Sequence, residues 1–301
     1  MGYNISQLPA YTNEQSTEFM LKSVLDAKTI DLLISAGSFM PELKGSEAIQ
    51  LMDKDVYFQD GSSCGRNPLG GVSLAQVEIT AKRIKSNENY CIAELETKYT
   101  VEQLKAKHKG QVYDDLVFNE QIGSAWAEKA AMEIENMVWQ GDITLTGSTN
   151  LKLIDGFVKR VKNATDKINL SGATGATVTA KLQAIFRTMP VAVRKKEDFR
   201  IFISEEMHDE YVAENTSASL FKDVDTSKLV QTSAKLEVVS GLNETGVVIA
   251  ARLRNLRAGG DLTNMELDKW YSKETDSVNL DAKFSLGTQI TYPQEIGYVK
   301  Y

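Results

Sequence analysis

The sequence is short of the residues that build disulfide, metal and nucleophilic sites. Only two cysteines, Cys64 and Cys91, and two histidines occur among its 301 residues. Two cysteines cannot make a disulfide framework or a four-cysteine zinc site, and they favour synthesis in a reducing compartment. Proline is also scarce, at five positions, and a content of 42% hydrophobic and 25% charged residues indicates a folded globular chain.

Long apolar runs and an excess of positive charge are also missing. No stretch approaches the ~20 apolar residues that cross a bilayer. Residues 17–36 are apolar enough to suggest a signal peptide, but Glu18, Lys22 and Asp26 interrupt them and no basic segment precedes them. Lys and Arg total 34 against 41 Asp and Glu, a formal charge of −7, which is not the basic footprint of a sequence-specific DNA-binding protein. We therefore expect no membrane segment and no sequence-specific contact with DNA.

The first half of the chain mixes extended and helical patterns. Residues 1–16 are polar and aperiodic, which indicates an extended arm, and apolar residues at helical spacing predict an amphipathic helix over 17–36. Four glycines and a proline in 61–71 predict a turn or mobile loop. Residues 75–83, AQVEITAKR, alternate apolar and polar side chains and predict a half-buried strand.

The segment after that strand is harder to assign. Ser86–Asn89 is predicted to be a turn, because Ser and Asn favour turns. Residues 90–110 fit either a return strand to about Tyr99 or a helix that ends before Gly110, and we favour a helix over the second half. A long helix over 117–140 is the strongest element, with an apolar stripe spaced by four that drifts around the axis: Phe118, Ile122, Trp126, Ala130, Ile134 and Val138. Gly141 is predicted to be its left-handed cap residue.

The second half predicts an α/β lobe followed by terminal strands. A helix over 177–189, capped by Thr177 and stopped by Pro190, precedes strands at 199–204, 236–240 and 246–251, with a short acidic helix between the first two strands. From Val278 to Leu286 every second residue is apolar, which predicts a strand without a helix of its own to cover it. The nearest helix that could cover it is the one over 117–140, far upstream in the sequence. We therefore expect the chain to leave a first lobe at Gly141–Gly156, to build a second lobe and to return, which also suits a length of 301 residues.

Each candidate catalytic or ligand-binding segment fits a structural role better than a functional one. His108 lies in a basic run and His208 on an acidic helix face without a second histidine, so both are interpreted as surface residues. Residues 171–176 are glycine-rich but lack the Gly-Lys-Ser/Thr ending of a phosphate loop. Asp142 and Asp155 could be paired carboxylates, yet each neighbours a glycine, which fits turn chemistry better. The sequence therefore predicts no catalytic, cofactor or metal residues.

A basic strip follows the strand over 246–251. Arg252, Arg254 and Arg257 could bind phosphate or pair with acids on a neighbouring subunit. The alternative is a solvated strand end, which the sequence supports equally well. Contact with nucleic acid is the weakest of these interpretations.

Taken in order, several phrases of the sequence resemble a tailed-phage major capsid protein of the Hong Kong 97 fold. They are a Gly-rich loop and strand (61–85), a long helix ending in Val138-Trp139-Gln140-Gly141-Asp142, then Leu153-Ile154-Asp155-Gly156-Phe157, Arg254-Asn255-Leu256, Gly259-Gly260-Asp261-Leu262, and terminal strands with Ile290-Thr291-Tyr292 and Ile296-Gly297-Tyr298. The resemblance covers about residues 50–301. It implies an α+β fold with an N-terminal arm (1–60), an extended loop with flanking strand and helix (61–115), a peripheral domain with a long spine helix (116–156 and 262–301) and an axial domain (157–261).

The function implied by the resemblance is assembly rather than catalysis. The chain would form pentamers and hexamers that build an icosahedral shell around a double-stranded DNA phage genome, in the virion and, during assembly, in the host cytoplasm. Portal and scaffold or decoration proteins would be its other partners, without cofactors, membranes or sequence-specific DNA contacts. An encapsulin-like nanocompartment shell of the same fold and, less favoured, a soluble two-lobed enzyme remain as alternatives.

The expected intersubunit contacts are Arg252, Arg254, Arg257, Lys82 and Lys85. The two lysines lie near the region where some family members crosslink a lysine to an asparagine, but no motif here identifies such a partner. The arm is too short for a cleaved scaffolding segment, which suggests a separate scaffold or none.

Overall fold

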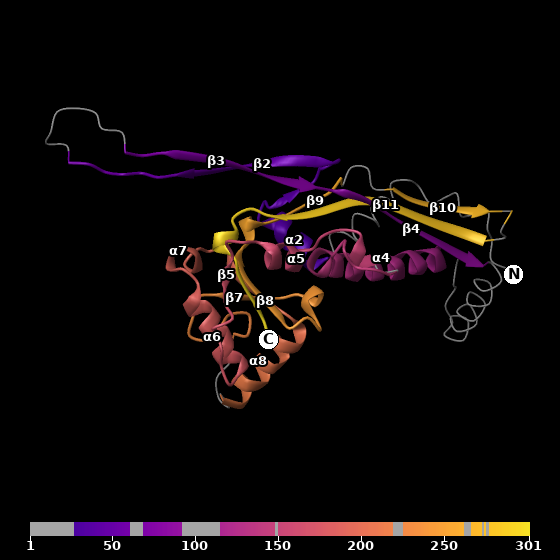
Figure 1. The fold of residues 1–301 in the computed structure, drawn as a ribbon. Helices are drawn as coiled ribbons and strands as arrows, with labels where there is room; N and C mark the ends of the chain where they lie inside the picture. The colour runs from indigo at the N-terminus through magenta and orange to yellow at the C-terminus, as the bar shows by residue number, and fades with distance from the viewer. Residues whose placement is uncertain are drawn as a thin grey trace.

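The computed structural model describes residues 27–60, 69–91, 115–147, 150–218, 225–261, 266–272, 274 and 277–301. Figure 1 shows a first lobe along the long helix α4, a second lobe below it, and a two-stranded ribbon that projects away from both. The expected α+β class is thus visible in the described chain. No helix in these ranges is long and apolar enough to cross a membrane.

The first lobe packs a sheet of distant segments over α4 (Asp115–Gln140), which confirms the long predicted helix. The strand order is β1-β9-β11-β10, and β4 also pairs with β11. On β11, Leu280, Ala282 and Phe284 are buried whereas Lys283 is exposed, so the alternation read from the sequence is confirmed. The bounds are β1 Phe39–Met40, β4 Lys82–Cys91, β9 Leu256–Gly259, β10 Glu266–Ser272 and β11 Ser277–Ile290.

The turn predicted at Ser86–Asn89 is wrong. These residues lie in the middle of β4, where Asn87 faces Asp281 and Asn89 faces Asn279 across the antiparallel pair with β11. The Trp126 indole of α4 donates a 3.0 Å hydrogen bond to the Glu88 carboxylate. A polar run can therefore be a strand here, because long-range pairing and one helix contact override its local preference for turns. Residues 92–114, for which helix and strand were both open, lie outside the described residues.

Helix α2 (Lys28–Ser35) is the C-terminal part of the helix predicted over 17–36; the rest lies outside the described residues. It packs on α4 through a buried polar group. The Thr29 amide and the Trp139 indole donate to the Glu135 carboxylate at 3.0 and 3.2 Å, and the Thr29 hydroxyl bonds the same carboxylate. The expectation that residues 1–60 form an arm is therefore corrected. From residue 27 onward, α2 and β1 belong to the first lobe and β2 belongs to the ribbon.

The ribbon consists of β2 (Ser46–Lys54) and β3 (Val72–Thr80), paired antiparallel along their whole length. The strand predicted at 75–83 is present only as far as Thr80, since Lys82 and Arg83 already belong to β4. It is half-buried only at its root, where Ile79 is fully buried. Val77 is partly exposed and Ala75 exposed. The ribbon therefore begins at Ser46, upstream of residue 61, where the extended loop was expected to begin. Residues 61–68 lie outside the described residues.

The second lobe is a five-stranded sheet in the order β5-β12-β8-β6-β7 with its own apolar core. The predicted strands and helices are confirmed, including the cap: the Thr177 hydroxyl accepts from the Ala180 amide. Two expected boundaries are corrected, because β9 pairs in the first sheet and β12 in the second. The bounds are α5 Phe157–Asn163, β5 Ile168–Asn169, α6 Val178–Thr188, α7 Val191–Arg194, β6 Phe199–Ile203, α8 Glu205–Ala218, β7 Lys235–Val238, β8 Val247–Arg252 and β12 Gly297–Lys300. Short 3-10 turns are η2 Asn150–Lys152, η3 Ser240–Leu242, η4 Leu253–Asn255 and η5 Pro293–Glu295.

The crossing between the lobes depends on two glycines that touch. The Gly156 amide donates to the Gly141 carbonyl at 2.7 Å. A Cβ on Gly141 would lie 2.5 Å from the carbonyl oxygens of Met137 and Ile154, and one on Gly156 would lie 2.5 Å from that of Trp139. The predicted left-handed cap at Gly141 is wrong, since Gly141 is not among the glycines with positive φ. Close backbone approach, and not φ, explains why glycine stands at both positions.

We expect Gly156→Ala to lower the free energy of unfolding by about 3 kcal/mol, because the added methyl group must displace backbone atoms rather than a flexible side chain. Urea unfolding followed by circular dichroism measures this change. Gly172→Ala is the matched control, because a Cβ there meets nothing within 4 Å, and we expect it to be neutral or slightly stabilising. Equal effects of the two substitutions would contradict the role given to the Gly141–Gly156 contact.

Candidate assembly surfaces

The far half of the ribbon, and the chain just beyond its two strands, carry large apolar side chains that nothing in the described chain covers. Phe58 is 96% exposed and Leu74 73% exposed, and the others exceed half exposure: Met52, Val56, Tyr57, Leu69 and Val72. Soluble monomers rarely expose contiguous apolar surface of this kind, and a lone two-stranded ribbon is marginally stable in water. The ribbon is therefore the strongest candidate contact surface.

The strand register shows that both faces of the ribbon are apolar. Met52 lies directly opposite Leu74, so these two side chains share one face. Leu51 opposite Ala75 and Ile49 opposite Val77 occupy the other face. An element that is apolar on both faces is suited to lie between other surfaces rather than against one.

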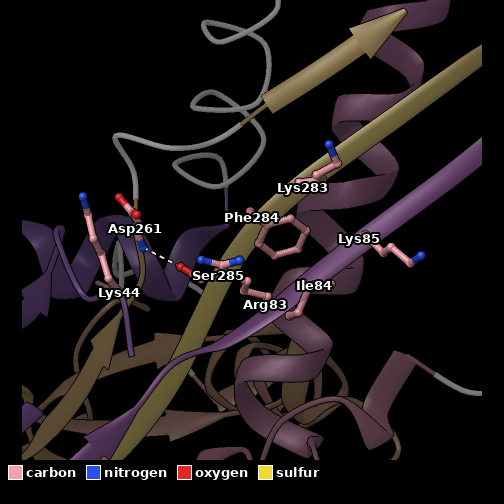
Figure 2. Close-up of a pocket in the computed structure, with 8 residues that line it drawn as sticks. All are labelled: Lys44, Arg83, Ile84, Lys85, Asp261, Lys283, Phe284 and Ser285. Carbon is pink, nitrogen blue, oxygen red and sulfur yellow. Dashed lines mark hydrogen bonds between the residues drawn. The ribbon is translucent and has the colours of Figure 1, made fainter. Parts of the chain in front are cut away.

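A basic groove lies on the first lobe, near the root of the ribbon (Figure 2). Its cavity of about 650 Å³ is lined by the basic side chains Lys44, Arg83, Lys85 and Lys283, with Ile84 and Phe284 as the apolar part, and Asp261 and Ser285 beside them. Lys85 of β4 stands directly opposite Lys283 of β11, two like charges in register. Of the two lysines selected from the sequence, Lys85 lines this groove, whereas Lys82 is an exposed residue at the start of β4.

The three arginines chosen from the sequence do not form one patch. Arg252, whose side chain is 13% exposed, pairs within the chain with Asp198 at 3.0 Å and Glu295 at 3.4 Å. Arg254 is exposed. Arg257 donates to the Gly37 carbonyl at 3.1 Å, and burial together with nearby Arg254 lowers its pKa. Intersubunit pairing stays a prediction for these arginines, and Arg252 already has its acids within the chain.

Arg252 and Arg254 can be separated by experiment. We expect Arg252→Met to lower the free energy of unfolding by about 2 kcal/mol, because two partly buried carboxylates lose their shared partner. Arg254→Met, at an exposed site in the same strip, should change it by less than about 0.5 kcal/mol. Thermal and urea unfolding of both variants measure the difference. A stability loss of the same size in both would contradict this assignment.

The crossing between the lobes brings Asp142 and Asp155 close together, which the sequence left open. They do not form a carboxylate pair with each other, because both bind the ammonium group of Lys159. The Lys159 ammonium bonds Asp142 at 2.7 Å and Asp155 at 2.5 Å. The hydrogen bonds from Lys159 and then Thr144 lower the pKa of Asp142 to about 2. Both carboxylates are thus held ionised, which suits a structural clamp rather than general acid–base chemistry.

This clamp should depend on pH in a defined direction. The folded pKa of Asp142, about 2, lies below its ordinary value of 3.8, so its contribution is complete above that value and is lost as pH falls toward 2. We expect Asp142→Asn to be less stable than the parent at pH 7 and equal to it near pH 2. Urea unfolding across this range measures the difference. A difference that stayed constant with pH would contradict the clamp.

The remaining candidates are structural. The Glu214 carboxylate accepts from the amides of Val178 and Thr179 at 2.8 and 2.9 Å, so the start of α6 already holds an anion and the glycine-rich loop before it is no phosphate site. The His208 ring lies 3.3 Å from the Thr226 carbonyl, and His108 lies outside the described residues. Among the residues the structure describes, no cluster of His, Cys, Asp and Glu could hold a metal ion.

The sequence matches no family model and no curated protein. The structure, however, matches solved structures over most of both chains. A chain of the satellite phage P4 procapsid aligns with a TM-score of 0.62 and 13% identity, covering 96% of this chain and 90% of that one. Gordonia phage Cozz aligns at 0.58 and 11%, covering 89% and 85%. A virus-like particle from Pyrococcus furiosus aligns at 0.51 and 14%, covering 91% and 97%.

The chain therefore has the capsid fold shared by these particles, and the Hong Kong 97-like fold expected from the sequence is confirmed. At 11 to 14% identity and TM-scores of 0.51 to 0.62, what is shared is the fold over most of each chain. The first strand of the ribbon and the groove were not predicted from the sequence. The apolar residues Leu51, Met52, Val56, Tyr57 and Phe58 are the local signal that could have indicated the strand.

Proposed function

We propose that this protein is a major capsid protein whose copies assemble into an icosahedral shell around double-stranded DNA. One observation carries the proposal beyond the fold: the ribbon has an apolar pattern that the described part of the chain leaves uncovered. Other copies of the chain would bury Phe58 and Leu74. Repetition of such contacts over a shell makes individually modest interfaces strong together.

The rest of the proposal follows from this role. Rings of five and six copies would form through heterologous contacts, in which different surfaces of neighbouring copies meet. The net charge of −7 suits a wall that confines DNA without binding it tightly. Portal, scaffold or decoration proteins would be further partners, with assembly in the host cytoplasm and the final location in the virion. The role is structural and not enzymatic.

A shell that encloses protein cargo is the second candidate, since the virus-like particle from Pyrococcus furiosus shares the fold. Shells purified from cells expressing the protein with its neighbouring genes separate the two candidates. Nuclease-protected DNA supports the first, and a stoichiometric protein inside the shell supports the second.

Negative-stain microscopy and sedimentation of the purified protein test the proposed function directly. We expect closed shells, or five- and six-membered rings, from the parent chain. Phe58→Asp should abolish them without changing the unfolding transition, because the side chain is 96% exposed in the single chain. Phe58→Leu keeps the apolar surface and should still assemble. A parent chain that stays monomeric at high concentration and with its neighbouring gene products would contradict the proposal.

A further inference from the structure

We propose that the side chain of Gln289 sets the direction of the ribbon, because it joins Arg160 of α5 to the backbone of β3 near the ribbon's root. The inference concerns the single chain, and only its consequence for shells rests on the proposed function. It starts from how few bonds hold the ribbon. Within the described residues, one hydrogen bond joins β2 or β3 to the chain outside the ribbon: the Gln289 side-chain nitrogen donates to the Glu78 carbonyl at 2.6 Å.

The ribbon leaves the first lobe at Thr80, where its backbone touches β11. A Cβ on Gly287 would lie 2.2 Å from the Thr80 carbonyl oxygen. The Gln289 bond holds β3 two residues further along, at Glu78, and beyond that point the ribbon leads away from both lobes (Figure 1). At about 3.3 Å per residue, a shift of about 1 Å at Glu78 relative to Thr80 moves the Val72 end of β3 by about 4 Å. The bond is therefore placed where a small change has a large effect on direction.

The side-chain amide of Gln289 binds a different kind of group at each end. Its oxygen accepts from the Arg160 guanidinium at 3.1 Å and from the Ile290 amide at 3.0 Å, and its nitrogen donates to the Glu78 carbonyl. An arginine only donates and a carbonyl only accepts, so these partners fix the orientation of the amide. Glutamate has the same length but, when ionised, only accepts. It would keep the bond to Arg160 and lose the bond to the ribbon.

Arg160 is a firm anchor because the crossing between the lobes holds it from the other side. Its Nε donates to the Asp155 carbonyl at 3.3 Å and to the Thr288 hydroxyl at 3.2 Å. Thr288 is fully buried, and its hydroxyl donates to the same carbonyl. The Asp155 carboxylate belongs to the Lys159 clamp. Contacts thus run without a break from the crossing through Arg160 and Gln289 to β3, so a change at the crossing is passed to the ribbon.

A purely stabilising role for Gln289 fits less well. The bond to Glu78 is exposed, and one hydrogen bond of that kind adds little to stability. The two strands are also held to each other without it, because β2 and β3 pair along their whole length and the Ser46 and Thr80 hydroxyls lie 2.8 Å apart. Loss of the Gln289 bond should therefore change where the ribbon points and not whether it forms.

Double electron–electron resonance between two spin labels measures the ribbon direction in the full-length chain. Ser73→Cys on β3 and Lys195→Cys at the end of α7 carry the labels, since both positions are exposed. Cys64→Ser and Cys91→Ser remove the native thiols. Phe58→Asp, together with an excess of unlabelled protein, limits the measurement to distances within single chains.

We expect Gln289→Glu to widen the distribution of label distances by about 4 Å or more at neutral pH, with the unfolding transition unchanged. Gln294→Glu is the matched control, the same change at an exposed glutamine of η5, and should leave the distribution as in the parent. Arg160→Met should also widen it. In a chain that already carries Gln289→Glu, Arg160→Met should add nothing, because both changes break the same run of contacts.

A distribution unchanged by Gln289→Glu, or widened equally by Gln294→Glu, would overturn the proposal. Widening by Arg160→Met that simply adds to that of Gln289→Glu would overturn the connection to the crossing. In a chain that keeps Phe58, Gln289→Glu should lower the yield of closed shells, because a ribbon without a fixed direction seldom reaches the surface that covers it. Absence of shells from the parent would count against the proposed function and leave the single-chain distances as they are.

Discussion

Trp139 is the side chain on which the arrangement of the two lobes depends. It is fully buried near the end of α4, with Phe157 of α5 and Phe202 of β6 at ring distances of 5.4 and 5.0 Å. Its indole donates to Thr29 of α2 at 2.7 Å, and a Cβ on Gly241 would lie 2.5 Å from its ring. One residue of the spine helix thus contacts the N-terminal helix and the second lobe together. The touching glycines next to it let the chain leave the helix without moving that ring aside.

How far the sequence predicts this fold depends on where each segment finds its partner. The spine helix and β11 could be predicted because their apolar periodicity matches burial within the same chain. Strand β4 could not be predicted, because Asn87 and Asn89 favour turns locally. They adopt a strand conformation by pairing with β11, which lies almost two hundred residues later in the sequence. Its pairing also creates the groove, so Lys85 could be selected from the sequence but Lys283 could not.

The ribbon shows a different limit. The alternation in β3 correctly predicts a strand, and it also predicts burial that the single chain does not provide at Ala75. Hydrophobic periodicity indicates that one face of a strand is apolar, but it does not indicate whether the same chain or another molecule covers that face. The arginine strip shows the reverse case. The sequence suggested that Arg252 could pair with acids of another subunit, whereas in the structure it pairs with Asp198 and Glu295 of its own chain. In both cases the deciding information is three-dimensional.

The order of the strands has a consequence for how the chain is made. β12, at residues 297–300, lies between β5 and β8, and β11 lies between β9 and β10. Neither sheet can close until residues 277–300 are available for pairing, and such long-range pairing is slow to form. A chain cut before Ser277 would have both sheets open and no formed groove, because β11 completes the first sheet and β12 the second. The two lobes therefore reach their final form together, through one segment that both of them share.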